Sequence, residues 1–125
     1  MKSIISTPKA PAAIGPYSQA VKTNNLLFTS GQIAIDPATG NIVGSNITEQ
    51  AEQVLKNISA ILSEAGYSLS DVVKTTVFIT DMSKFAELND IYSKFFNGAT
   101  PARSAVEVSA LPKGALVEIE TIASK

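Results

Sequence analysis

The chain has 125 residues, the size of one domain, and its 45% hydrophobic and 17% charged residues favour a folded core over disorder. We therefore expect a single domain spanning residues 1–125. A net charge of −1 lacks the basic surface of most nucleic-acid binders, so no nucleic acid is expected as a partner. Cysteine and histidine are absent, which excludes disulfides, thiol nucleophiles, serine–histidine triads and zinc fingers.

The first forty residues predict three short strands and no leader or anchor. No apolar stretch is long enough for a signal peptide or approaches the roughly 20 residues of a membrane span, which predicts a cytoplasmic protein without a membrane partner. Short strands are expected near Ile4 and Val21. Leu26–Ser30 is a third β-prone run, and Asp36–Gly40 supplies the residues of a turn.

The next two elements are a long helix and a strand. Apolar residues recur at a period near 3.6 from Ile47 to Ala65, which predicts an amphipathic helix that ends at Gly66. Asp71–Ile79 is dense in β-branched residues and predicts a strand. By the period of two, one face of this strand should carry Val73, Thr75, Val77 and Ile79.

A second helix and two strands complete the chain. Ser83 is the predicted N-cap of a helix that closes at Asn97-Gly98. Residues 102–108 and 115–123 read as strands separated by a proline and a glycine. The resulting order, β-β-β-α-β-α-β-β, predicts an α+β sandwich in which one sheet is covered on one face by two helices.

The other face of that sheet is predicted to be mixed. In a regular last strand, Leu116 and Ile122 share a face with Glu118 and Glu120. Such a face is either solvated or packed against another subunit, and we favour packing for so small a sheet. Oligomerisation is therefore a hypothesis.

Arg103 is the only arginine and lies inside a predicted strand. Its planar guanidinium can grip a carboxylate through two parallel hydrogen bonds, which suits an organic-acid ligand. A structural ion pair with Glu107, Glu118 or Glu120 is the more ordinary explanation. Composition and spacing alone favour the ion pair.

Several other polar residues are candidates for a site. If an interface covers Glu118 and Glu120, burial would raise the pKa of one carboxyl toward neutrality and make it a general base, whereas a nearby arginine would oppose the shift. Asn89 lies at the edge of a helical apolar face and needs a partner, most simply a neighbouring loop. Tyr17 follows a turn, and Ser30-Gly31 combines a hydroxyl with a residue that allows close approach to the backbone.

Nucleotide and calcium motifs are missing, since the sequence has no GxGxxG fingerprint, P-loop or EF-hand pattern. We expect neither a cofactor nor a metal. The residues taken by themselves indicate a site for a small organic acid.

Four motifs in a fixed order resemble the RidA/YjgF family. They are Pro11-Ala12-Ala13-Ile14-Gly15-Pro16-Tyr17-Ser18-Gln19-Ala20, Thr29-Ser30-Gly31-Gln32, Val73-Lys74-Thr75-Thr76-Val77-Phe78 and Pro101-Ala102-Arg103-Ser104. The resemblance implies a chorismate-mutase-like fold and a homotrimer with a barrel-like core and ligand clefts between subunits. It also implies cofactor-independent hydrolysis of 2-imino or enamine acids, such as 2-iminobutyrate and 2-iminopropionate, to 2-keto acids and ammonia.

The resemblance also assigns roles by position. Arg103 would bind the substrate carboxylate, Glu118 would position or activate water, and Tyr17 would orient the water or the intermediate. The substrate-binding positions would be Ser30, Gly31, Asn89, Ala105 and Pro112. Ala105 stands where many deaminating members have cysteine, so a backbone contact is preserved there but thiol chemistry is not.

Two other functions remain open at this point. A regulatory trimer that binds 2-keto acids without turnover would use the same arginine, but it would gain nothing from Glu118 beside the ligand. A ribonuclease or translation inhibitor, a label carried by some family members, is disfavoured by the net charge of −1 and the absence of histidine.

Overall fold

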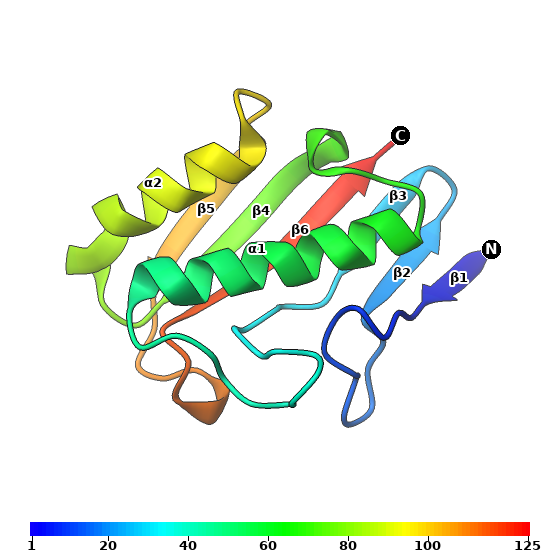
Figure 1. Cartoon of the computed structure of the whole chain (residues 1–125). Helices are drawn as coiled ribbons and strands as arrows, with labels where there is room; N and C mark the ends of the chain where they lie inside the picture. Colours follow the sequence, from blue (N-terminus) through cyan, green and yellow to red (C-terminus); the bar gives the residue numbers. More distant parts are fainter.

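The computed structural model describes all 125 residues as one six-stranded sheet with two helices on a single face (Figure 1). The order of elements and the single layer of helices confirm the α+β prediction. Strand neighbours follow the order β1-β2-β3-β6-β4-β5, and only β4 and β5 run parallel. The elements are β1 (Lys2–Ile5), β2 (Ala20–Thr23), β3 (Leu26–Thr29), α1 (Ile47–Glu64), β4 (Val72–Ile79), α2 (Phe85–Phe96), β5 (Ala102–Glu107) and β6 (Val117–Ser124).

Helix α1 supplies the centre of the core. Asn46 caps it, since its side-chain oxygen accepts a hydrogen bond from the Glu49 N–H at 2.9 Å. Gly66 follows the helix with a φ of 82°, a left-handed conformation that favours glycine, as expected for a stop signal. The predicted apolar face is buried against the sheet and α2, through Ala51, Val54, Leu55, Ile58, Ile61 and Leu62.

The predicted face of β4 is wrong at its first residue. Thr75, Val77 and Ile79 are buried on the helix side as expected, but Val73 is 48% exposed and Val72 is buried instead. The register between β4 and β6 shifts between Val72 and Lys74. A β-bulge inserts one residue and inverts the alternation that a regular strand would keep.

Ser83 does not cap α2, which corrects the sequence prediction. The chain first forms a 3₁₀ turn at Met82–Lys84, and Asp81 caps this turn by accepting hydrogen bonds from the Ser83 N–H and hydroxyl. Helix α2 starts only at Phe85 and has no side-chain cap. Its end is as predicted, because Asn97 adopts the left-handed conformation with a φ of 45°.

The face of the sheet that carries no helix is mixed, as predicted. Along β6, Val117, Ile119, Thr121 and Ala123 are buried toward the helices, whereas Glu118 and Glu120 lie on the other side. That open face also exposes large apolar side chains, among them Ile4, Phe28, Val73 and Val106. No helix has the length and apolar character needed to cross a membrane.

Candidate functional site

One cleft of about 610 Å³ gathers most of the predicted site residues. Three segments line it: the loop between β1 and β2, the segment after β3, and the chain that enters β6. Its lining is partly apolar and partly polar, as in many small-molecule sites. The polar and turn residues that line it are Tyr17, Ser30, Gly31, Gln32, Pro112, Lys113 and Glu118.

The side chain of Gln19 holds the loop that carries Tyr17. Gln19 is 3% exposed and accepts a hydrogen bond from the Thr7 N–H at 2.7 Å. Its amide nitrogen donates to the carbonyls of Thr7 at 3.0 Å and Pro11 at 2.8 Å. The loop has no regular structure of its own, so this one amide replaces the backbone pairing that a strand would supply.

Replacing Gln19 with leucine should therefore lower the free energy of unfolding by about 1–3 kcal/mol, because buried backbone groups would lose their partner. Urea denaturation followed by circular dichroism measures this change. The control is Gln53 of α1, which is half-buried and donates one hydrogen bond, to Asn57 Oδ1 at 2.9 Å. Replaced in the same way, it should change stability less. Equal stability of the two variants would contradict the role assigned to Gln19.

Ser30 and Gly31 form a corner that joins this loop to β6. The Ser30 hydroxyl donates to the Ser18 carbonyl at 2.6 Å, and the Ser30 N–H donates to the Gln19 carbonyl at 2.9 Å. The Ser30 hydroxyl proton is therefore already used within the chain. The N–H of Gly31 makes no hydrogen bond and is free to donate to a ligand.

Glu118 is the only acidic side chain in the cleft, and it has no hydrogen-bond or ion-pair partner in the chain. Burial raises the pKa of its carboxyl above the ordinary value, and the negative charge of Glu120 raises the pKa further. A carboxyl in this state holds and releases a proton nearer to neutral pH than an exposed glutamate does.

Gly31 leaves the space that the Glu118 carboxyl occupies. A Cβ added at Gly31 would lie 2.8 Å from the Glu118 Cδ and would overlap its Oε2. The Gly31→Ala variant should fold, because Gly31 has no left-handed φ and the end of the glutamate is flexible. The carboxyl would have to move, so any reaction in which it accepts a proton should slow by about tenfold or more, as for misplaced catalytic groups. Steady-state kinetics of wild type and Gly31→Ala, compared at equal concentrations of folded protein, would measure the loss. An unchanged kcat/KM would contradict the prediction.

Arg103 belongs to a second cluster, on the helix side of the sheet. Its Nη1 donates to Asn89 Oδ1 at 2.8 Å, and its guanidinium carbon lies 4.9 Å and 4.8 Å from the ring centres of Phe85 and Tyr92. Asn89 thus has the partner that its position required. Ala105 lies two residues beyond Arg103 on the same face of β5.

The expected ion pair of Arg103 is absent. Neither salt bridge of the chain includes Arg103, and no carboxylate oxygen lies within 4.0 Å of its guanidinium. Stacking on aromatic rings and one amide contact fix the side chain while leaving most of its N–H donors free. The arrangement suits capture of an external carboxylate.

Arg103 and Glu118 do not lie beside each other within one chain, so the ion pair with Glu118 that the sequence left open is not formed. Arg103 pairs with Thr75, which is buried on the helix side, whereas Glu118 pairs with Phe78 on the open side. Strand β4 also separates β5 from β6. One chain therefore carries the predicted site residues in two separate clusters.

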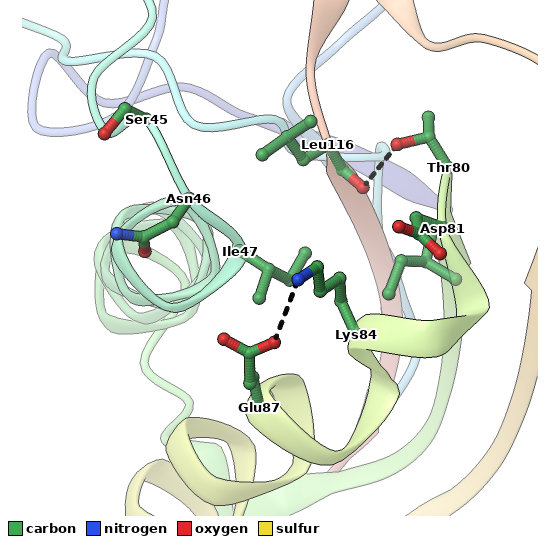
Figure 2. Close-up of a pocket in the computed structure, with 9 residues that line it drawn as sticks. Ser45, Asn46, Ile47, Thr80, Asp81, Lys84, Glu87 and Leu116 are labelled. Carbon is green, nitrogen blue, oxygen red and sulfur yellow. Dashed lines mark hydrogen bonds and ion pairs between the residues drawn. The ribbon is translucent and has the colours of Figure 1, made fainter.

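A second pocket, of about 280 Å³, lies at the N-terminus of α1 (Figure 2). Its polar groups are already engaged: Lys84 Nζ lies 3.9 Å from Glu87 Oε2, the Thr80 hydroxyl donates to the Leu116 carbonyl at 3.5 Å, and Asp81 accepts from Ser83. Side-chain and backbone hydrogen bonds from Ser83 lower the pKa of Asp81. The larger cleft with its free carboxyl is therefore the better candidate.

Comparison with known proteins identifies the family. The family model described as endoribonuclease L-PSP matches residues 7–125. The chain belongs to this family, which is the RidA/YjgF family. A RutC family protein of Pyrococcus horikoshii is 58% identical over 125 residues, which are 100% of this chain and 99% of the relative. The 2-iminobutanoate/2-iminopropanoate deaminase of Mus musculus is 50% identical over 123 residues, which are 98% of this chain and 91% of the mouse protein.

Solved structures of Rid family members have the same fold. A Rid family protein of Yersinia pestis superposes with a TM-score of 0.97 at 56% identity and full coverage of both chains. E. coli TdcF, solved with bound serine, gives a TM-score of 0.94 at 46% identity over 98% of each chain. A small amino acid is thus a ligand of that relative.

Several residues of the two clusters were not predicted from the sequence. Phe85 and Tyr92, which stack on Arg103, share a helical face with Asn89 by their spacing of four and three residues. That spacing was a readable signal. Gln32 is also among the residues that line the cleft, and although it stands in the motif Thr29-Ser30-Gly31-Gln32, the sequence assigned it no role.

Proposed function

We propose that this RidA/YjgF member is a cofactor-independent hydrolase that converts 2-imino or enamine acids, such as 2-iminobutyrate and 2-iminopropionate, to 2-keto acids and ammonia. The observation that supports it best is the partnerless Glu118 carboxyl, with its raised pKa, inside the cleft of about 610 Å³. The mouse relative named as a deaminase for these two substrates supports the same activity.

The proposed mechanism uses Glu118 as the general base. The carboxylate takes a proton from water as the oxygen attacks C2 of the protonated imine, which gives a neutral tetrahedral amino alcohol. Glu118 then returns this proton to the nitrogen. As the C2–N bond breaks and ammonia leaves, the carboxylate takes the remaining hydroxyl proton and C2 becomes a carbonyl. The Gly31 N–H and the Tyr17 hydroxyl, both free in the cleft, would orient the water and the substrate.

The substrate carboxylate would be bound by Arg103 of a neighbouring subunit. Within one chain, the arginine and the glutamate point to opposite faces of the sheet, so a complete site needs two copies. We propose the homotrimer with a barrel-like core and a chorismate-mutase-like arrangement that the family resemblance implies. Exposed apolar residues on the open sheet face, Phe28 and Val106 among them, supply the surface to be covered.

Two other functions predict different behaviour. A 2-keto acid sensor would bind the product without turnover, and a free carboxyl beside an acidic ligand argues against it. The family name includes an endoribonuclease, but the net charge of −1 and the lack of histidine disfavour RNA cleavage. A cytoplasmic location remains part of the proposal.

The decisive experiment measures 2-keto acid release from 2-iminobutyrate and 2-iminopropionate generated in situ by an amino-acid oxidase. We expect the protein to accelerate keto acid release over the spontaneous rate. Light scattering of the same sample should give a molecular mass near three times 13.1 kDa. No acceleration, with 2-oxobutyrate binding intact, would favour the sensor. Cleavage of RNA at low salt would favour the ribonuclease.

A further inference from the structure

Helix α2 presents two aromatic rings and one amide to the guanidinium of Arg103. Phe85, Asn89 and Tyr92 share one face of the helix, and the seven residues between the first and the last span about 10 Å of its axis. The guanidinium carbon lies 4.9 Å from the centre of the Phe85 ring and 4.8 Å from the centre of the Tyr92 ring. Arg103 Nη1 donates to Asn89 Oδ1 at 2.8 Å. The guanidinium therefore lies between the two rings, beside two turns of the helix.

Tyr92 is itself tied to the sheet by a hydroxyl, which Phe85 lacks. This hydroxyl shares a hydrogen bond of 2.8 Å with the hydroxyl of Thr75 in β4, and the two residues are only 4% and 0% exposed. Thr75 is also the residue of β4 that lies opposite Arg103 in the parallel pairing of β4 with β5. The Tyr92 ring is thus fixed to the sheet at the level where Arg103 leaves it.

Arg103 has few other restraints. It has no ion pair, and the only hydrogen bond of its side chain within the chain is the one to Asn89. A long side chain that is mobile before binding loses rotamer freedom when it holds a ligand, and this loss weakens binding. A guanidinium that is already ordered by rings and an amide avoids most of that loss.

We propose that Tyr92 is a positioning residue for Arg103: the buried Thr75–Tyr92 hydrogen bond fixes the ring, and the ring orders the guanidinium for binding of a substrate carboxylate. The inference rests on the proposed function in its last step, because the contacts of Arg103 with Tyr92 lie within one chain. Tyr92 acts through Arg103 and contacts no substrate atom in this role. Burial raises the pKa of the Tyr92 hydroxyl, so the hydroxyl stays protonated at neutral pH.

The test observes Arg103 directly. Because Arg103 is the only arginine, its Nε–Hε group gives a single signal in a nitrogen–proton NMR spectrum. In wild type, the two rings should displace this signal, and its relaxation should report an ordered side chain. In Tyr92→Leu the signal should move to the position of a mobile arginine. KM for 2-iminobutyrate and Kd for 2-oxobutyrate should each rise about three- to tenfold, with little change in kcat, because substrate and transition state lose the same contact.

Tyr67→Leu is the matched control. Tyr67 is also a buried tyrosine with a bonded hydroxyl, which donates to the Asn25 carbonyl at 2.9 Å, and Lys22 Nζ lies 5.4 Å from the centre of its ring. It contacts the turn between β2 and β3, and β6 and β4 separate these strands from β5. Tyr67→Leu should lose stability much as Tyr92→Leu does but leave the Arg103 signal and KM unchanged.

Tyr92→Phe keeps the ring and removes only the bond to Thr75, so it is the variant to use if Tyr92→Leu does not fold. It should displace the Arg103 signal and raise KM about two- to threefold. An Arg103 signal like that of wild type in both Tyr92 variants would overturn the inference, as would equal changes in Tyr67→Leu. A displaced signal with unchanged KM and Kd would overturn it too, because the ring would then order the arginine without serving the site.

Failure of the proposed function would be seen separately. If the wild type has no deaminase activity but Tyr92→Leu still frees Arg103 and weakens 2-oxobutyrate binding, the proposed function fails and the role of Tyr92 stands. If the wild type neither turns over 2-iminobutyrate nor binds 2-oxobutyrate, both fail.

Discussion

The Arg103→Ala variant is expected to lose about 10²–10⁴ in kcat/KM for 2-iminobutyrate. Two charge-assisted hydrogen bonds from the guanidinium to the substrate carboxylate contribute about 1.5–3 kcal/mol each, and both would be lost. Arg103→Lys keeps the positive charge but not the planar fork, so it should recover only a part of the activity. Steady-state kinetics, with 2-oxobutyrate binding measured in parallel, would record the loss.

The folding of these variants is the control on that result. Arg103 has no carboxylate partner, so its removal leaves no buried charge, and only the stacking on Phe85 and Tyr92 and the bond to Asn89 are lost. The subunits should therefore remain folded and associated. Lys56→Ala removes an exposed cation that pairs with Glu52, and it should leave activity unchanged. Full activity in Arg103→Ala would exclude the arginine from the site.

The Glu118→Gln variant should lose about 10²–10⁴ in kcat, the usual contribution of a general base. The amide keeps the size of the side chain but cannot take a proton from water. Binding of 2-oxobutyrate should be retained, because the keto acid is held by other groups. Loss of binding together with turnover would contradict the role of Glu118 in proton transfer.

The raised pKa of Glu118 also predicts how activity and stability depend on pH. Activity should fall as the pH drops through this pKa, since the base becomes protonated. Stability has the opposite sign: between the unfolded and folded pKa values the native state binds more protons, so the unfolding free energy rises as the pH falls. Glu118→Gln should therefore be more stable than wild type at neutral pH, with a difference that shrinks in acid. Urea denaturation of both proteins, repeated from neutral to acidic pH, would measure this difference in unfolding free energy.

Glu120→Gln is a matched control two residues along the same face of β6. Burial is the main cause of the raised Glu118 pKa, and the Glu120 charge is a further cause. The pH–rate profile of Glu120→Gln should have its acidic limb at lower pH than that of wild type, with nearly the same maximal rate. An unshifted limb would mean that the limb reports another group.

The sequence predicted those parts of the fold that depend on a repeating pattern. The 3.6 period placed α1 within one residue of its observed end, and the period of two correctly separated the two faces of β6. Both succeed because side-chain direction follows directly from backbone geometry inside a regular element. The same argument failed at Val73, where a bulge breaks the repeat, and at Ser83, where Asp81 starts a 3₁₀ turn first.

The candidate site was predicted residue by residue, but its assembly was not. Family motifs pointed to Tyr17, Ser30, Gly31, Pro112 and Glu118, and the structure gathers these in one cleft. The motifs carry no information on how the cluster around Arg103 is placed relative to the cleft.

By itself, then, the sequence determined the order of elements, the two helical faces, the mixed open face of the sheet and the absence of histidine and thiol chemistry. Only the tertiary structure decided that Arg103 and Glu118 lie on opposite faces and that Gln19 holds the loop of Tyr17. The physical reason is that the order and register of strands bring together residues far apart in the chain. Local periodicity fixes the direction of a side chain within its element, but not which side chain of another element it meets.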